Sequence, residues 1–483
     1  MKHTKAIFCL LIAAQLAAIS CGENTPGSGT TAPNTDGTTE PVETVDTLYS
    51  DLPTGNFDGA EFRMLSEEET GWAIIQITAD EQNGEIINDT IYSIDRIVED
   101  RLNVKITSEF ITNAGMVRDT IRTAAAAGDD EYSVYNNTAN VTAPLILEGY
   151  FRELAELPNL NLDKPWWDEA LRESMTFNGK CYSFIGDLSV MPYECRYVIH
   201  INNTLADKLK IGDCYQTVRD GKWTLDQLYN DTKLAYSDLN GNGTVEFGDQ
   251  VGICSNLRAM SYFMIAGGEN IYTSDKGLPG FNGLSEKATD MYSNILEKLF
   301  MNESAMIAGM KFPDGKSWTS AFTDGISLYL FEPLGTMRKF NETDFDYGVL
   351  PIPKYDESQS DYIVPIIHFV HSNFVTKLAK DPEMISTVLE NLSAESYKTL
   401  RPAYFKKVLE GKRAQDEGTL DMLDLIFSSE TVLNQACVFD WGGLTSNLNS
   451  NAHDKNESVS SVIATILPSV KSDIEKTIEF YSE

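Results

Sequence analysis

The chain has 483 residues, of which 42% are hydrophobic, and its 72 Asp and Glu residues against 38 Lys and Arg residues give a formal net charge of −34. This length is enough for more than one hydrophobic core. The excess of negative charge argues against binding to nucleic acid and against docking on anionic lipid, because both of those surfaces are themselves negatively charged.

The first 20 residues have the pattern of an export signal. Lys2, His3 and Lys5 form a basic head, and residues 6–19 are an apolar run broken only by Gln15. The run is too short to span a bilayer as a permanent helix, but it suits the apolar core of a secretory signal. We therefore expect residues 1–20 to be removed on export.

Cys21 follows directly after small Ser20, as in the lipoprotein signals of bacteria, which the segment resembles. Cys21 is therefore predicted to carry a lipid, with ordinary secretion and an incidental cysteine as the alternative. Residues 22–47 are almost free of apolar side chains, so residues 21–55 are predicted to be a flexible tether. The expected location is extracytoplasmic, on a membrane held only through the lipid.

The body begins with an alternation of predicted strands and helices. The strands are expected at residues 61–65, 104–106 and 132–135, and the helices at residues 90–102 and 114–127. This rhythm is typical of an α/β fold with a parallel sheet covered by helices. Since such sheets bind ligands outside the carboxyl ends of their strands, we expect the loops at residues 66–72 and 136–142 to face a ligand.

A second set of elements follows from residue 198. Strands are predicted at residues 198–201, 325–331 and 347–350, a helix begins at residue 203, and Thr224 is the expected N-cap of the next helix. The C-terminal third is predicted to be helical, with amphipathic runs at residues 382–392, 395–409, 416–427 and 458–481.

Residues 238–249 match the calcium-loop template D-x-[DN]-x-[DN]-G. A hard cation needs about six or seven oxygen ligands, and alternate residues of a tight loop all direct oxygens inward. The departure from the template is Asp249, where a helical calcium loop has a bidentate Glu. A structural Ca²⁺ site is predicted, with a metal-free Asn-Gly turn as the alternative. Its candidate ligands are Asp238, Asn240, Asn242, Thr244, Glu246 and Asp249.

The chain lacks catalytic signatures and is predicted not to be an enzyme. It contains no HExxH, GxSxG or P-loop motif. Two of its six tryptophans, Trp72 and Trp441, are candidates for stacking on a ligand ring, and core packing is the alternative for both. Five cysteines remain in the body without CxxC spacing, and their pairing cannot be assigned from the sequence: Cys181, Cys195, Cys214, Cys254 and Cys437.

Several short motifs, taken in order, resemble a known family. They include Pro165-Trp166-Trp167, Gly221-Lys222-Trp223-Thr224, the loop at Asp238, Tyr347-Gly348-Val349-Leu350-Pro351 and Pro402-Ala403-Tyr404-Phe405. In these positions the chain resembles the lipid-anchored extracellular solute-binding proteins (family 1) of bacterial ABC importers, especially a clostridial type. Relatives that bind acidic oligosaccharides carry a calcium loop of this kind.

The resemblance implies a two-lobed periplasmic-binding-protein-like fold (type II) with the ligand in the cleft between the lobes. It places residues 56–188 and 322–355 in the first lobe and residues 189–321 and 356–483 in the second. It also implies a monomeric receptor that captures a sugar or oligosaccharide by lobe closure and delivers it to an ABC permease. The alternatives are a surface protein that retains or senses carbohydrate and a glycan-active enzyme.

The candidate ligand contacts come from the predicted strand ends, the region between the two sets of elements and the tryptophan pattern, and not from motif transfer. They are Trp72, Asn136, Asn137, Thr138, Asp187, Glu332 and Trp441.

Overall fold

The computed structural model describes residues 48–68, 71, 73–129, 131–410, 417–454 and 457–483. The predicted signal, Cys21, residues 21–47 of the tether and Trp72 lie outside these ranges. The chain divides into two units, residues 1–52 and residues 53–483. At the described end of the first unit, the Leu52 N–H donates to the Tyr49 carbonyl over 3.4 Å. Every helix in the described ranges falls short of the combined length and hydrophobicity that spanning a bilayer requires.

The first sheet of the body has four strands in the order β12-β3-β1-β2. They are β1 (Ala60–Glu67), β2 (Val104–Ile111), β3 (Val134–Thr138) and β12 (His371–Phe374). β1 is parallel to both β2 and β3, whereas β12 is antiparallel to β3. The predicted strands at the start of the body are confirmed, and each is longer than or shifted from its predicted range.

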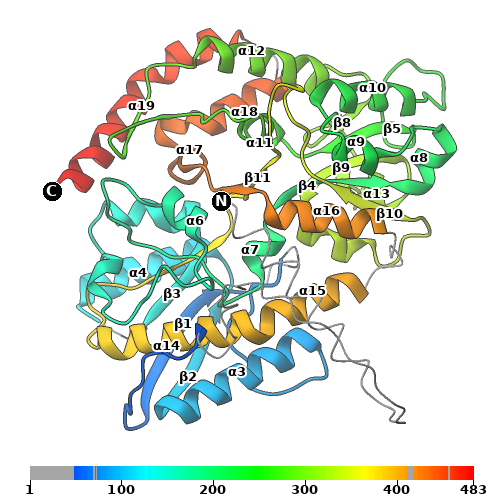
Figure 1. Ribbon diagram of the computed structural model, residues 1–483. Helices are drawn as coiled ribbons and strands as arrows, with labels where there is room; N and C mark the ends of the chain where they lie inside the picture. The colour runs from blue at the N-terminus through cyan, green and yellow to red at the C-terminus, as the bar shows by residue number, and fades with distance from the viewer. Residues whose placement is uncertain (1–47, 69–70, 72, 130, 411–416, 455–456) are drawn as a thin grey trace, which may run out of the picture. The chain divides into compact units, whose positions relative to one another are not determined.

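Two helices make the crossovers between the parallel strands, α3 (Ile86–Leu102) and α4 (Ala114–Ala127). α3 buries a stripe that includes Ile91, Ile94 and Val98, as a helix with apolar residues three and four apart does. α4 ends at Gly128, whose φ of 69° is the left-handed conformation that glycine adopts most easily. α3 also packs against α14 (Pro382–Glu395), and Figure 1 shows these two helices side by side.

The second sheet has five strands in the order β10-β4-β9-β5-β8. They are β4 (Tyr197–Asn202), β5 (Val251–Ser255), β8 (Ala305–Ile307), β9 (Ser327–Pro333) and β10 (Tyr347–Leu350). β5 is parallel to β8 and β9, while β4 is antiparallel to β9 and β10. A Cβ on Gly252 of β5 would lie 2.4 Å from the carbonyl oxygen of Thr232, so glycine allows α10 (Leu225–Ala235) to approach this strand closely.

Shorter helices and two small sheets complete the body. β11 (Ile363–Pro365) pairs in parallel with β13 (Glu430–Val432), and β6 (Thr273–Asp275) forms a hairpin with β7 (Leu278–Gly280). The remaining helices up to residue 300 are α5 (Ala139–Thr142), η1 (Ala143–Ile146), η2 (Leu154–Glu156), α6 (Glu169–Ser174), α7 (Met191–Glu194), α8 (Asn203–Leu209), α9 (Cys214–Arg219), α11 (Ala259–Ala266), α12 (Glu286–Ile295) and η3 (Leu296–Phe300). Those after it are α13 (Trp318–Thr323), η4 (Leu334–Phe340), η5 (Ser396–Leu400), α15 (Arg401–Glu410), α16 (Glu417–Ser428), α17 (Gln435–Phe439), η6 (Trp441–Gly443), α18 (Leu444–Asp454) and α19 (Val459–Ser482).

The chain passes between the two sheets through residues 187–196 and residues 366–370, here called the crossing segments. The first leads to β4, and the second leads from β11 to β12. They are bonded to each other, because the Ile367 N–H donates to the Cys195 carbonyl over 3.0 Å and Arg196 forms an antiparallel bridge with Ile366. A change of angle between the sheets therefore has to act on both segments together.

The strand pairing corrects the predicted lobe boundaries in two places. Residues 322–355 were expected with the first sheet, but β9 and β10 pair with β4 in the second. β12 was expected in the second lobe, yet it pairs with β3 in the first sheet. These boundaries came from the family resemblance, which rests on short local motifs, and such motifs carry no information about the partner of a strand.

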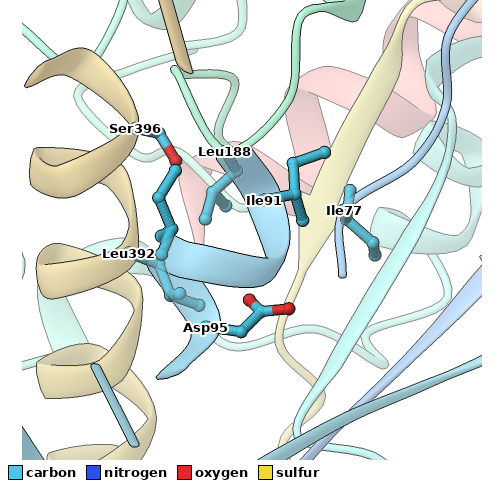
Figure 2. Close-up of a pocket in the computed structure, with 7 residues that line it drawn as sticks. Ile77, Ile91, Asp95, Leu188, Leu392 and Ser396 are labelled. Carbon is cyan, nitrogen blue, oxygen red and sulfur yellow. The ribbon is translucent and has the colours of Figure 1, made fainter. Parts of the chain in front are cut away.

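A small pocket lies between α3, α14 and the first crossing segment, and it contains a buried carboxyl group. It is lined by Ile77, Ile91, Ile94, Asp95, Leu188, Leu392 and Ser396. Figure 2 shows the Asp95 carboxyl directed into the space between these side chains. Its Oδ2 accepts the Ala79 N–H over 2.9 Å. Burial in these apolar surroundings raises the pKa of Asp95 to about 7, and the Ala79 bond offsets only part of this.

Asp95→Asn is expected to remove a pH dependence of stability. The unfolded carboxyl loses its proton near its ordinary pKa of 3.8 and the folded one only near 7, so the native state loses stability as the pH rises between these values. The variant should gain on the order of 3 kcal/mol relative to wild type from pH 4 to pH 8. Urea unfolding across this range measures it. Asp100→Asn, at an exposed position of the same helix, is the matched control, and a wild-type curve parallel to that of Asp95→Asn would contradict the prediction.

Candidate functional site

Buried polar side chains collect at one edge of the first sheet, where the parallel strands β1 and β3 end and antiparallel β12 begins. Register places Ser66 beside Asn136, and Asn136 beside Asn373. Glu67 is 7% exposed and His371 is 4% exposed. Polar groups buried at a strand end in this number are typical of a site rather than of a core, because each has to be satisfied by a hydrogen bond. We call these five residues the first polar edge.

The hydrogen-bond directions within the first polar edge follow from one backbone carbonyl. Asn373 Nδ2 donates to the Phe184 carbonyl over 3.3 Å, so its Oδ1 accepts from Asn136 Nδ2 at 2.8 Å. Asn136 Oδ1 then faces His371 Nδ1 at 2.7 Å and also accepts from Ser66 Oγ at 3.0 Å. His371 therefore carries its ring proton on Nδ1.

These hydrogen-bond directions leave His371 Nε2 and Glu67 Oε2 as two neighbouring acceptors. Burial lowers the pKa of His371 below its ordinary value, with the neighbouring Glu67 acting in the opposite direction. In the neutral ring Nε2 has a lone pair, and it lies 3.4 Å from Glu67 Oε2. An incoming hydroxyl would donate its one proton to either atom, and two adjacent hydroxyls would satisfy both. The first polar edge is thus complementary to a donor.

A second polar edge lies at the carboxyl ends of β5 and β9, and consists of Asn256, Arg258, Trp318 and Glu332. Glu332 Oε1 accepts from Trp318 Nε1 over 2.6 Å and from Asn256 Nδ2 over 3.1 Å. Desolvation raises the pKa of Glu332, while these donors and the charge of Arg258 act to lower it. The combination of an indole, an amide, a guanidinium and a carboxylate offers both a flat apolar face and hydrogen-bonding groups.

The second crossing segment connects the two edges. Its His368 and Val370 carbonyls accept the N–H groups of Asn140 and Ala139, which follow β3. On the other side, Tyr262 of α11 contacts His368 through a hydroxyl that lies 2.7 Å from Nδ1. Burial and the nearby Arg258 lower the pKa of His368 to about 3, so its ring is neutral. The Arg258 guanidinium of the second polar edge also lies over the Phe369 ring, 4.5 Å from its centre, so residues 366–370 contact that edge as well as the residues that follow β3.

Asp187 lies in the first crossing segment and is already engaged by internal partners. The Tyr193 hydroxyl donates to its Oδ1, and Arg401 Nη1 lies 3.9 Å from its Oδ2. Burial raises the pKa of Asp187 to about 6 against the opposing charge of Arg401. Arg401 in turn covers the rings of Tyr193 and Tyr397. These contacts give Asp187 a role in holding the crossing segment to α15.

The other candidate contacts differ in their placement. Asn136 and Glu332 lie in the two polar edges, and Thr138 is buried opposite His371 in register. Asn137 Nδ2 donates to the Ala114 carbonyl and to Thr142 Oγ1, so its amide serves the packing of α4. Trp441 is 2% exposed, stacks on Phe439 and donates to Thr477 Oγ1. These contacts correspond to the packing alternative for Trp441.

Sequence reasoning missed His371, Asn373, Asn256, Arg258 and Trp318 as candidate site residues. β12 consists of His371-Ser372-Asn373-Phe374. Because this sequence is mostly polar, it lacks the apolar pattern by which strands are recognised. Asn256 was detectable in principle, because it directly follows the apolar strand β5. Ser66 and Glu67 fall within the predicted ligand-facing loop at residues 66–72.

The loop at residues 238–249 holds its oxygen atoms through its own backbone. The Asp238 carboxylate accepts the Gly241 and Gly243 N–H groups over 2.7 Å each, and these bonds lower its pKa. The Asp249 carboxylate accepts the Leu239 and Glu246 N–H groups over 3.0 Å each.

The donor set of this loop consists of oxygen atoms, which is the kind that a hard cation binds. Asn240 Nδ2 also donates to Glu246, so positions three and nine of the loop lie together. Within the described ranges, however, no group of three or more His, Cys, Asp and Glu side chains is arranged to hold a metal ion. The Ca²⁺ site stays a prediction.

Comparison with known proteins identifies the fold. No family model and no curated protein matches the chain. Among solved structures, the chain is similar to a cyclo/maltodextrin-binding protein complexed with maltotetraose, with a TM-score of 0.58 and 12% identity over 87% of this chain and 97% of that one.

Two further structures have a TM-score of 0.54. An ABC substrate-binding protein from Listeria monocytogenes in complex with cycloalternan is 14% identical over 88% of this chain and 100% of that one. A maltose/maltodextrin-binding domain from Bdellovibrio bacteriovorus bound to maltotriose is 12% identical over 87% and 100%. The predicted fold class is confirmed: the chain has the two-lobed, type II α/β fold of periplasmic sugar-binding proteins.

Proposed function

We propose that this chain is an extracellular solute-binding receptor of an ABC importer, and that it captures a sugar or oligosaccharide between its two polar edges. The observation that carries the proposal is the pair of acceptors at the first polar edge, Glu67 Oε2 and His371 Nε2, 3.4 Å apart and buried at a strand end. A sugar hydroxyl has the donor that this pair lacks. The bound oligosaccharides of the structural neighbours support the same ligand class.

Binding in this proposal works by closure rather than by catalysis. A ligand that contacts both polar edges favours the closed arrangement, because only there does it gain both sets of hydrogen bonds. The crossing segments absorb the change of angle. The permease would then recognise the closed form. The similar solved structures are binding proteins, which favours this reading over a glycan-active enzyme.

Glu67→Gln and Glu332→Gln are each expected to weaken sugar binding by about tenfold or more, since each removes a charged acceptor from a buried hydrogen-bonding edge. Isothermal titration with maltotriose, maltotetraose and cycloalternan measures the affinity. Glu61→Gln, at the opposite end of β1, and Glu303→Gln, just before β8, are the matched controls because both residues are exposed.

Four outcomes are decisive, and the last of them comes from an uptake experiment in cells. Affinity for none of a wider oligosaccharide panel would refute the proposal, and so would turnover of a bound sugar. Equal losses in the control variants would show that the two edges are not the site. If a strain lacking this chain keeps its uptake of the bound sugar and loses only surface retention of it, the chain is a retaining protein instead.

The membrane anchor is a separate part of the proposal. It rests on the apolar run at residues 6–19 and on Ser20 before Cys21. Mass spectrometry of the mature protein should find a diacylglyceryl group on Cys21 as its first residue, and Cys21→Ser should release the protein into the medium. A mature N-terminus at any other position would contradict the anchor.

We also propose that the loop at residues 238–249 binds Ca²⁺ in a structural role. The melting temperature should fall on addition of a chelator and recover with Ca²⁺, because bound metal stabilises only the folded state. In Asp238→Ala, which removes the first carboxylate of the loop, the melting temperature should no longer respond to either addition. Asp314→Ala, an exposed substitution elsewhere, is the control. A wild-type protein that melts identically with and without Ca²⁺ would exclude the site.

A further inference from the structure

Glu194 joins parts of the chain that lie on either side of the crossing segments. It is the last residue of α7, in the first crossing segment, and it is 2% exposed. Its Oε2 accepts the Ile74 N–H over 2.6 Å and lies 3.9 Å from Arg338 Nη2. Ile74 follows β1 of the first sheet, and Arg338 belongs to η4, which follows β9 of the second.

Each residue that Glu194 contacts belongs to a segment that follows a polar edge in the sequence. The segment at residues 73–79 continues the chain beyond Glu67, and Ile74 is its point of attachment to Glu194. Its other end is held by the Asp95 carboxyl, which accepts the Ala79 N–H. On the second side, η4 begins directly after the strand that carries Glu332, and the Leu334 N–H donates to the Arg196 carbonyl over 2.8 Å. Glu194 thus contacts the continuation of each edge.

One carboxylate oxygen makes both contacts. Because Ile74 N and Arg338 Nη2 are both near Oε2, a shift of Arg338 changes how strongly a cation competes with the Ile74 N–H for this oxygen. A hydrogen bond to a charged acceptor is also stronger than one to a neutral acceptor. The low exposure of Glu194 leaves little solvent to screen this interaction. A rearrangement on the side of the second sheet therefore changes the strength of the hydrogen bond that holds the loop after β1 at Ile74.

We propose that Glu194 is a positioning residue that couples the two polar edges: it places the segment at residues 73–79 for ligand binding according to the position of Arg338. This inference rests on the proposed function for its effect on affinity, but the coupling itself exists without ligand. Glu194 touches no ligand in this scheme. It acts through the Ile74 backbone on one side and the Arg338 guanidinium on the other.

The first test needs no ligand. Hydrogen exchange at the Ile74 amide reports directly on its bond to Glu194. Arg338→Met should change that exchange rate at least threefold, because Arg338 acts on Ile74 through Glu194. Arg219→Met, which removes a surface ion pair with Asp421, should leave the rate unchanged. An unchanged rate in Arg338→Met would overturn the coupling, whether or not the protein binds sugar.

The second test uses affinity for the tightest sugar of the panel. Glu194→Ala should weaken binding at least tenfold, and Glu194→Gln, which keeps an oxygen for the Ile74 N–H but not the charge facing Arg338, should restore part of the loss. In the double variant Glu194→Gln/Arg338→Met the effects on affinity should be less than additive, because both act through one oxygen. Additive effects, or equal losses in the Gln and Ala variants, would overturn the proposal.

The two tests separate the possible failures. If the wild-type protein binds no sugar, the proposed function fails, and the exchange experiment still decides the coupling. If Glu194→Ala does not fold, the Gln and Met variants carry the affinity test, since each keeps a polar or apolar side chain of similar size. If sugar binds and Glu194→Ala binds it like wild type, Glu194 has only a local structural role.

Discussion

The structure depends on the hydrogen bonds between the two crossing segments. The backbone bond from Ile367 to Cys195 and the bridge between Arg196 and Ile366 hold the two crossing segments together. Since both segments are bonded, neither sheet can turn without bending both. Asp187 and Glu194, which are buried in the first crossing segment, have partners on other parts of the chain, Arg401 and Ile74, as buried charges must. The two crossing segments therefore have to bend together when the angle between the sheets changes.

The position of the crossing segments explains why the polar groups lie where they do. β1, β3, β5 and β9 all direct their carboxyl ends to loops next to the crossing segments, and residues 366–370 touch elements from both sides. Buried polar side chains cost free energy unless they are bonded, so a cluster of them at a strand end indicates a requirement other than stability. The two edges supply hydrogen-bonding groups, while the apolar sheets behind them supply the stability.

Much of the fold was predictable from local patterns. The helix at residues 114–127 and the strand at residues 347–350 occur at the predicted bounds, and Thr224 is the N-cap of α10. These features depend on neighbours in sequence, which a single chain displays. The partners of β9 lie 76 to 136 residues away in the sequence and that of β12 lies 233 to 239 residues away, so their sheets could not be assigned.

The site was predictable only where it follows apolar strands. Asn136 and Glu332 were found because each belongs to a recognisable strand. His371 and Asn373 were missed because β12 is short, polar and antiparallel. Trp441 was selected for its residue type, and its packing against Phe439 shows how little residue type reveals about exposure. Glu194 illustrates the same limit, since its two partners are 120 and 144 residues away.

The direction of the hydrogen bonds at the first polar edge has a consequence for selectivity. The Phe184 carbonyl orients Asn373, which orients Asn136, which fixes the His371 proton on Nδ1. The chain of bonds starts at the backbone, so no side-chain rotation reverses it without breaking a buried bond. A sugar methylated at the oxygen bound there would present only lone pairs to Glu67 and His371. The protein would then distinguish a free hydroxyl from its methyl ether by polarity as well as by size.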